Sequence, residues 1–221
     1  MQNETPATIA VLGGTGKEGG GLALRWAHKG HKVIIGSRTA ERAREAAAEM
    51  NATLSSENVS GAANPDAAAQ ADIVVLAVPY AAQQSTVKEV EQALAGKILI
   101  DVTVPLVPPK VSRVQLPNGG SAVEAVQKML GEGVKVVSAF QNISAHHLTH
   151  LDEEIECDVL VCADDGEAGD TVVALAQEIG LRAWYAGPLC NSVVAEGLTS
   201  VLIALNRRYK VPGSGIRITG V

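Results

Sequence analysis

Short apolar runs alternate with longer segments of helical period at the start of the chain. Residues 8–12 are an apolar run that ends in glycines, and apolar residues recur at helical spacing through residues 17–29. Residues 32–35 form a second apolar run, and the Ala- and Glu-rich residues 40–51 have the pattern of an amphipathic helix. The pattern predicts a strand, a helix, a strand and a helix, which together begin a βαβ arrangement.

The same alternation continues after residues 52–66, which are polar and small and show no clear period. Residues 72–79 are a continuous apolar run, as in a central strand of a parallel sheet, whose two faces are both buried. Further elements are predicted as helices at 80–94, 121–130, 167–179 and 192–206, and as strands at 97–101, 134–139, 159–163 and 182–186. This alternation predicts an α/β protein with a Rossmann-type, doubly wound parallel sheet.

The pattern loosens after Gln141, which is the one candidate boundary along the chain. We therefore expect a dinucleotide-binding domain of residues 1–140 and a small C-terminal α/β part of residues 141–221. Residues 102–120 hold four prolines and two glycines and follow the end of a predicted strand. Long ordered loops in this position are often functional.

Composition and charge restrict the class of protein. Hydrophobic residues make up 47% and charged residues 19% of the chain, which is typical of globular proteins, and the net charge of -6 disfavours nucleic acid and anionic membranes as partners. No apolar stretch approaches the roughly 20 residues that cross a bilayer, so we expect a cytoplasmic protein. Cys157, Cys162 and Cys190 lack CxxC spacing, which predicts reduced thiols and no metal site.

A glycine-rich loop follows the first predicted strand and precedes the first predicted helix. Its pattern is Gly14-x-Gly16-x-x-Gly19, which allows a tight turn and a close approach of backbone N–H groups to a pyrophosphate at the helix N-terminus. A Walker A loop is excluded because Glu18 stands where Ser or Thr is required and Val11 where the first glycine belongs. The loop therefore predicts that the protein binds a dinucleotide.

The end of the second predicted strand indicates which dinucleotide binds. NAD-dependent enzymes place an acidic residue there to hold the ribose 2′-hydroxyl, whereas this chain has Ser37 and Arg38, with Arg42 one helical turn further on. A hydroxyl and guanidinium groups form charge-assisted hydrogen bonds with a 2′-phosphate, and Thr15 can reach the same phosphate. The sequence therefore predicts NADP(H) rather than NAD(H).

No acid or base stands out among the segments expected at the carboxyl ends of the strands. These segments are residues 78–80, the loop after Asp101, and residues 140–142, and the chain has no Tyr-x-x-x-Lys pair. The histidines of the loosened region are interpreted as surface or hydrogen-bonded residues rather than catalysts or ligands: they are His146, His147 and His150. Hydride transfer between two carrier rings needs stacking and exclusion of water more than an acid, so we predict no catalytic side chain.

Several segments together resemble the NADPH-dependent reductases of coenzyme F420, an 8-hydroxy-5-deazaflavin. The similarity extends over nearly the whole chain, and its C-terminal Ala-Gly-Pro-Leu-x-Asn-Ser segment is more specific than the glycine loop. The segments that carry it are residues 11–16, 19–25, 36–38, 105–108, 137–139, 151–153 and 186–192.

The resemblance implies reversible hydride transfer between NADPH and C5 of the deazaflavin, in a homodimer whose C-terminal part completes the deazaflavin pocket. It implies that the pyrophosphate is held by Thr15, Gly16, Lys17 and Glu18, and the 2′-phosphate by Ser37, Arg38 and Arg42. It places Val78 and Tyr80 beside the nicotinamide and its ribose, and it places Leu189, Asn191 and Ser192 near the deazaflavin.

The chain departs from the archaeal members mainly on the side of the second ring. Gln141 stands in place of their His, Ser144 in place of Pro and Cys190 in place of Ser, and the 102–120 loop differs in sequence and length. On the NADP side, Arg42 replaces Lys and Tyr80 replaces Trp.

Two other functions remain open from the residues themselves. An NADPH-dependent imine or carbonyl reductase related to pyrroline-5-carboxylate reductase would need a proton donor, for which His146, His147 and Asn191 are the candidates. A non-enzymatic protein that senses NADPH would also lack a recognisable catalyst.

Overall fold

Strand β1 (Ile9–Leu12) lies in the interior of the sheet because all four of its residues are apolar and buried. In the computed structural model, which describes residues 7–221, it pairs in parallel with β2 (Val33–Ser37) on one side and β4 (Ile73–Leu76) on the other. The eight strands are ordered β3-β2-β1-β4-β5-β6-β7-β8. The remaining strands are β3 (Val59–Ala63), β5 (Ile98–Asp101), β6 (Lys135–Ser138), β7 (Asp158–Ala163) and β8 (Arg182–Tyr185).

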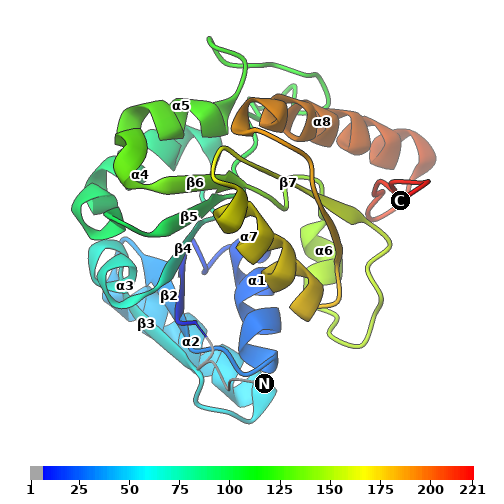
Figure 1. The fold of residues 1–221 in the computed structure, drawn as a ribbon. Helices are drawn as coiled ribbons and strands as arrows, with labels where there is room; N and C mark the ends of the chain where they lie inside the picture. Colours follow the sequence, from blue (N-terminus) through cyan, green and yellow to red (C-terminus); the bar gives the residue numbers. More distant parts are fainter. Residues whose placement is uncertain (1–6) are drawn as a thin grey trace.

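Helices cover both faces of the sheet (Figure 1). They are α1 (Lys17–His28), α2 (Ala40–Leu54), α3 (Asn64–Gln70), α4 (Gln83–Val90), α5 (Ala122–Leu130), α6 (Ala145–Leu148), α7 (Gly166–Glu178) and α8 (Ser192–Tyr209). Single 3-10 turns also occur, at η1 (Tyr80–Ala82), η2 (Glu91–Leu94), η3 (Gly131–Gly133) and η4 (Leu189–Asn191).

Alternate residues of β1 belong to two separate hydrophobic clusters. Ile9 and Val11 pack in the cluster that includes apolar residues of α1, α2 and α7, whereas Ala10 and Leu12 pack with α3, α4 and α5. Successive strand residues point to opposite faces, so one strand supplies both cores. The predicted doubly wound α/β fold is confirmed.

The sequence pattern missed β3 and α3, which lie within or overlap residues 52–66 and the segment that follows. Strand β3 is at the edge of the sheet and reads Val-Ser-Gly-Ala-Ala, with only Val59 strongly apolar. A Cβ added at Gly61 would clash with the backbone of Ala43 in α2. The close approach of α2 selects small residues here, and small residues hide the strand from a hydrophobic pattern.

The sheet continues without a break past Gln141, but its last two strands are reversed. Strand β7 is antiparallel to β6, with Val137 opposite Ala163 and Ser138 opposite Cys162, and β8 is parallel to β7. Helix α6, which the pattern did not predict, has only four residues. A parallel return usually runs through a crossover helix, and the connection between β6 and β7 contains only this short one, so the chain reverses direction here. The sheet is therefore mostly parallel.

The helical segment Leu189–Tyr209 differs from the expectation that no apolar stretch approaches membrane-spanning length. Its 21 residues reach a mean hydropathy of 1.4 over an 18-residue window, enough to cross a membrane by length and composition alone. The difference arises because η4 and α8 continue each other and α8 runs past Asn206 to Tyr209. The inner face of α8 packs on the protein, where the Glu196 carboxylate accepts hydrogen bonds from the start of α5.

Arg25 of α1 links the first helix to the C-terminal part of the chain through hydrogen bonds. Its guanidinium is buried and donates to the carbonyl oxygens of Leu148 at 2.9 Å, Ile179 at 3.1 Å and His150 at 2.7 Å. A fourth hydrogen bond, of 3.1 Å, goes to the carbonyl of His147. These bonds join α1 to α6 and to the end of α7.

Replacing Arg25 tests this connection. Arg25→Met keeps the apolar stem but leaves four buried or half-buried carbonyl oxygens without their donor, so we expect the free energy of unfolding to fall by about 3 kcal/mol. The melting temperature in a thermal scan should fall by roughly 6–12 °C. Arg208→Met, at the exposed end of α8, is the control and should change the free energy by less than about 0.5 kcal/mol. Equal small shifts in both variants would contradict the role given to Arg25.

Candidate functional site

A cavity of about 520 Å³ opens at the carboxyl ends of β1, β2 and β4. This is the point where the strand order reverses, because β1 is flanked by β2 and β4, and open α/β sheets bind their ligands at such a switch point. The volume is within the usual range of ligand pockets. The lining residues are Gly13, Thr15, Gly16, Ser37, Arg38, Arg42, Asn64, Ala77, Val78, Pro79, Ala82, Ser85, Thr86 and Glu89.

The glycine loop brings the N-terminus of α1 to this cavity. Gly13 has a φ of +83°, and a Cβ at this position would clash with the carbonyl oxygen of Ala77 at the end of β4. Gly16 is the N-cap of α1, and no side chain caps this end of the helix. The first N–H groups of α1 are therefore available to an anion, as binding of a pyrophosphate requires.

The other glycines of the predicted motif have a packing role. Gly14 is buried, and a Cβ there would lie 2.9 Å from Cδ1 of Ile35. Gly19 is also buried, and its Cβ would lie 2.9 Å from Cβ of Ala77. Neither lines the cavity, but both let the loop and the first turn of α1 lie against the sheet.

Ser37, Arg38 and Arg42 meet at one corner of the cavity, as the sequence predicts. Both guanidinium groups belong to exposed residues, and no carboxylate among residues 7–221 forms an ion pair with either of them. Strand β2 ends at Ser37 without an acidic residue. The donor set suits a phosphate on the ribose and lacks the carboxylate that would accept from a 2′-hydroxyl at this turn.

Four polar residues of the lining were not predicted. Asn64 starts α3, and the other three lie on α4, far from the glycine loop in sequence: Ser85, Thr86 and Glu89. Asn64 is 3% exposed, its Nδ2 donates to a carboxylate oxygen of Glu89 at 3.4 Å, and its Oδ1 has no partner. No motif marks these positions, because tertiary packing alone brings α3 and α4 beside the end of β2.

Lys17, Glu18 and Tyr80 do not line the cavity, although they stand next to residues that do. Lys17 is exposed in the first turn of α1, and Glu18 and Tyr80 are half-buried. Burial raises the pKa of the Glu18 carboxyl to about 8. Below that pH this side chain is neutral, so it would not repel an anion bound at the start of α1.

The residues predicted for the second ring lie outside this cavity. Gln141 is buried, and its Nε2 donates to the carbonyl oxygen of Asp101 at 2.8 Å. Leu189 and Ser192 are fully buried, whereas Asn191 is exposed and its Nδ2 donates to the carbonyl oxygen of Ala186 at 2.8 Å. Gln141 and Ser192 thus serve the protein's own hydrogen bonds in this structure.

A buried carboxyl that the sequence reading passed over stands at the carboxyl end of β5. Asp101 is fully buried and accepts from Nε2 of Gln83 at 2.7 Å and from the backbone N–H of Thr103 at 2.8 Å. Burial raises the pKa of this carboxyl, although both neighbours lower it. Asp101 thus links the start of the 102–120 loop and the first turn of α4 to the carboxyl end of β5.

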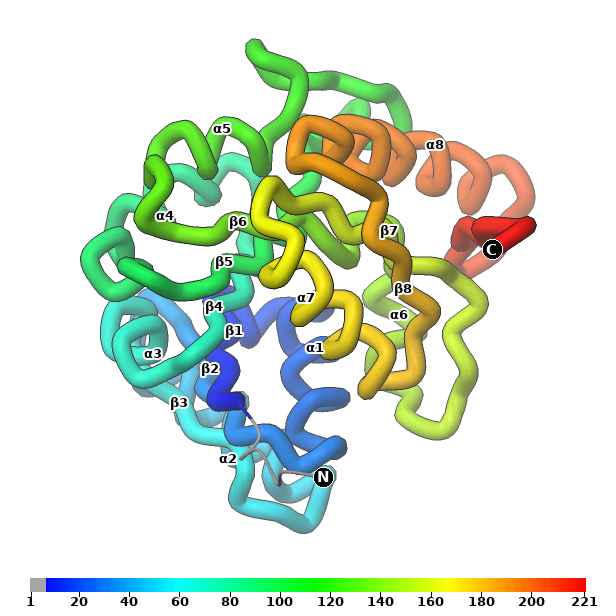
Figure 2. Tube along the Cα trace, viewed as in Figure 1, coloured from blue at the N-terminus to red at the C-terminus, as the bar shows by residue number. Residues whose placement is uncertain are grey.

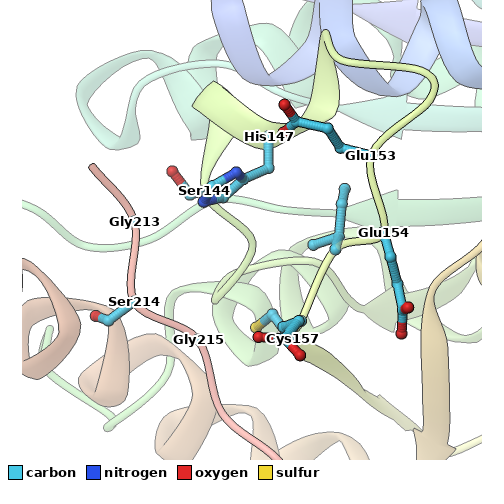
Figure 3. A pocket seen from close by; sticks show the side chains of 10 residues that line it. Ser144, His147, Glu153, Glu154, Cys157, Gly213, Ser214 and Gly215 are labelled. Atoms are coloured by element: carbon cyan, nitrogen blue, oxygen red, sulfur yellow. The ribbon is translucent and has the colours of Figure 1, made fainter. Parts of the chain in front are cut away.

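A second cavity, of about 460 Å³, lies between α6, residues 153–157 and residues 213–215 (Figure 3). Three carboxylates line it, Glu153, Glu154 and Glu156, so it disfavours the phosphates of a dinucleotide. His147 faces this cavity, which shares no lining residue with the first one. This arrangement gives no support to His147 as a proton donor at the dinucleotide site.

Comparisons with known proteins agree with this geometry. Residues 8–105 match the family described as NADP oxidoreductase, coenzyme F420-dependent. The F420-dependent NADP reductase of Methanocaldococcus jannaschii is 45% identical over 221 aligned residues, covering 96% of this chain and 98% of that protein. The protein of the same name from Methanothermobacter thermautotrophicus is 43% identical, covering 96% and 95%.

A solved structure is similar over the same length. The crystal structure of a protein from Arthrobacter sp. FB24, provisionally described as an F420-dependent NADP reductase, superposes with a TM-score of 0.78. Its sequence identity is 28%, and the match covers 96% of this chain and 99% of that one.

Arg38→Ala tests the phosphate corner. We expect Arg38 to donate a charge-assisted hydrogen bond to the 2′-phosphate, so its loss should weaken NADPH binding by roughly 1–3 kcal/mol and leave NADH binding nearly unchanged. Fluorescence titration of both dinucleotides measures this. Arg44→Ala, an exposed arginine of the same helix region that does not line the cavity, is the control. Equal losses for NADPH and NADH would remove the 2′-phosphate assignment.

Proposed function

Because the chain belongs to the family of coenzyme F420-dependent NADP oxidoreductases, we propose that it transfers a hydride reversibly between NADP(H) and coenzyme F420. It is an NADP-dependent oxidoreductase, and both redox partners are small-molecule substrates. The observation that carries the proposal is similarity to named reductases over nearly the whole chain, together with a cavity that offers donors to a dinucleotide phosphate at the switch point of the sheet. This reading is favoured over an imine or carbonyl reductase and over a sensor of NADPH.

The roles of individual residues follow from the cavity and the family. The uncapped start of α1 and Thr15 would hold the pyrophosphate, with Lys17 and Glu18 beside it, and the corner at Arg38 would hold the 2′-phosphate. Val78 lines the cavity and Tyr80 stands at its edge, on the side where the nicotinamide would lie. The protein's part in the hydride step is then to stack two rings and exclude water.

The C-terminal part is assigned the deazaflavin side. Residues 141–221 would complete that pocket at the end of the sheet that lies past β5, with exposed Asn191 at its surface and the buried residues Gln141, Leu189 and Ser192 behind it. The division into residues 1–140 and 141–221 is one of function, since the sheet runs through both.

We also propose that the enzyme is a cytoplasmic homodimer whose interface includes the outer face of α8. Val194, Val201 and Leu205 are 62%, 44% and 39% exposed and lie on one side of this helix by their spacing. Exposed Val114 and Leu116 of the 102–120 loop lie next to Gly197 of α8. The loop runs beside this helix in Figure 2. A contiguous apolar patch of this kind marks an interface. A monomeric mass in light scattering would contradict the dimer.

The direct test of function mixes NADPH with oxidised F420 in a stopped-flow instrument. The visible absorbance of the deazaflavin should bleach at a rate on the order of 1–10³ s⁻¹, as expected for an enzyme. NADH at the same concentration should react far more slowly. Binding of NADPH without any bleaching would refute hydride transfer to this acceptor and would favour the sensor.

Glu18 generates a pH-dependent prediction. Its carboxyl is neutral below its raised pKa of about 8 and becomes charged as the pH rises through that value. The new charge would stand beside the bound pyrophosphate, so NADPH affinity should fall about fivefold between roughly pH 7 and pH 9.5, equivalent to ~1 kcal/mol. Titration of NADPH across this range measures the fall.

Glu18→Gln should remove that fall because the amide does not ionise. Glu132→Gln, at an exposed position in η3, is the matched control and should keep it. An unchanged pH profile in Glu18→Gln would show that Glu18 does not face the pyrophosphate.

A further inference from the structure

The carboxylate of Glu196, on the inner face of α8, caps a different helix. It is 1% exposed, and its Oε1 accepts from Oγ of Ser121 at 2.6 Å and from the backbone N–H of Val123 at 3.3 Å. Its Oε2 accepts from the backbone N–H of Ala122 at 2.8 Å. These N–H groups belong to the first turn of α5 and have no acceptor within their own helix. One side chain of α8 therefore completes the N-terminus of α5.

Ser121 and Ser192 extend this contact to the two segments that flank the deazaflavin side. Ser121 directly follows the 102–120 loop, and Ser192 is the first residue of α8 after η4. Their hydroxyl oxygens lie 2.7 Å apart. Because the Ser121 hydroxyl donates to Glu196, Ser192 is the donor in this second bond. The end of the loop and the start of α8 are thus joined at one buried carboxylate.

A third segment is bound by the same face of α8, one turn further along. The Oγ1 of Thr199 donates to the carbonyl oxygen of Gln141 at 2.8 Å. The Nδ2 of Asn142 donates to the carbonyl oxygen of Ala195 at 2.8 Å and lies 3.1 Å from Oγ1 of Thr199. Residues 192, 196 and 199 share one helix face by their spacing. This polar face, defined as Ser192, Glu196 and Thr199, starts in the segment that follows η4 and is hydrogen-bonded to Ser121, which follows the 102–120 loop, and to Gln141.

The network also reaches the carboxyl end of the interior strand β5. Nε2 of Gln83 donates to the carbonyl oxygen of Ala122 at 3.2 Å and to the carboxylate of Asp101 at 2.7 Å. The position of α8 is thereby tied to the carboxyl end of β5 through the first turn of α5. The NADP cavity does not include any of these residues.

The carboxyl group of Glu196 is costly to desolvate, so packing alone does not explain its burial. No cation among residues 7–221 forms an ion pair with it, and burial raises the pKa of its carboxyl despite the hydrogen bonds. An apolar residue of similar volume would avoid the cost of desolvation. What an apolar residue would not supply is a fixed orientation of three separate segments.

We propose that Glu196 is the positioning residue for the second substrate: through the polar face of α8 it sets the geometry of the deazaflavin pocket without taking part in NADP(H) binding. This role rests on the proposed function, since it concerns the pocket of the second ring. It predicts that damage to the polar face is expressed in the KM for F420 and is absent from the affinity for NADPH.

The test compares steady-state kinetics and NADPH titration in the full-length protein. Glu196→Gln keeps the volume but turns an amide N–H₂ toward the N–H groups of α5, so we expect the KM for F420 to rise about tenfold. The Kd for NADPH should stay within about twofold of the wild-type value, because no residue of the NADP cavity is touched. Ser200→Ala removes a buried hydroxyl of the same helix outside the network and should change neither value.

A second variant keeps the test valid if Glu196→Gln fails to fold. Thr199→Val preserves shape, removes only the hydroxyl that donates to Gln141, and should raise the KM for F420 about threefold. Wild-type KM in both folded variants, or equal rises in the KM for F420 and the Kd for NADPH, would overturn the positioning role while leaving the function intact. A wild-type enzyme that reduces no F420 would overturn the proposed function, and the positioning role with it.

Discussion

The site depends on a tight turn at Gly13, where there is no room for a Cβ atom. The turn after β1 passes so close to the carbonyl of Ala77 that a Cβ would clash with it, and the backbone adopts a positive φ there. Only this path delivers the uncapped start of α1 to the carboxyl edge of the sheet between β1 and β4. The uncapped start of the helix, the guanidinium groups of Arg38 and Arg42 and the end of β4 at Val78 then meet at one cavity.

Two buried polar side chains hold the C-terminal part in place against that framework. Arg25 donates to carbonyl oxygens near α6 and α7, and Glu196 accepts from the first turn of α5. Each contacts backbone groups that would otherwise lack a partner at helix ends or loops. The glycine loop and the turn after β2 are thus set by local turn chemistry, whereas the C-terminal part is held by hydrogen bonds between segments far apart in sequence.

This difference explains what the sequence could predict. The glycine loop and the Ser37-Arg38 turn are short contiguous motifs, so a few neighbouring residues are enough to predict their backbone conformation. Strand β3 was not predicted because the close approach of α2 leaves room only for small side chains there. The antiparallel pairing of β7 was not predicted because the pattern of apolar residues in a strand does not show its direction in the sheet. Asn64, Glu89 and the Glu196 network depend on which helices meet, and no local pattern records that.

The continuity of the sheet has a mechanical consequence. Because β6 pairs directly with β7, and α8 is hydrogen-bonded both to α5 and to the segment after β6, the regions before and after Gln141 share one continuous sheet and do not form separate lobes. Enzymes with two separate lobes can close around their ligands by rotating one lobe against the other. Here that movement would break the pairing of β6 with β7, so residues 7–140 cannot rotate as a rigid lobe against residues 141–221, and any closure around a ligand would be confined to surface loops.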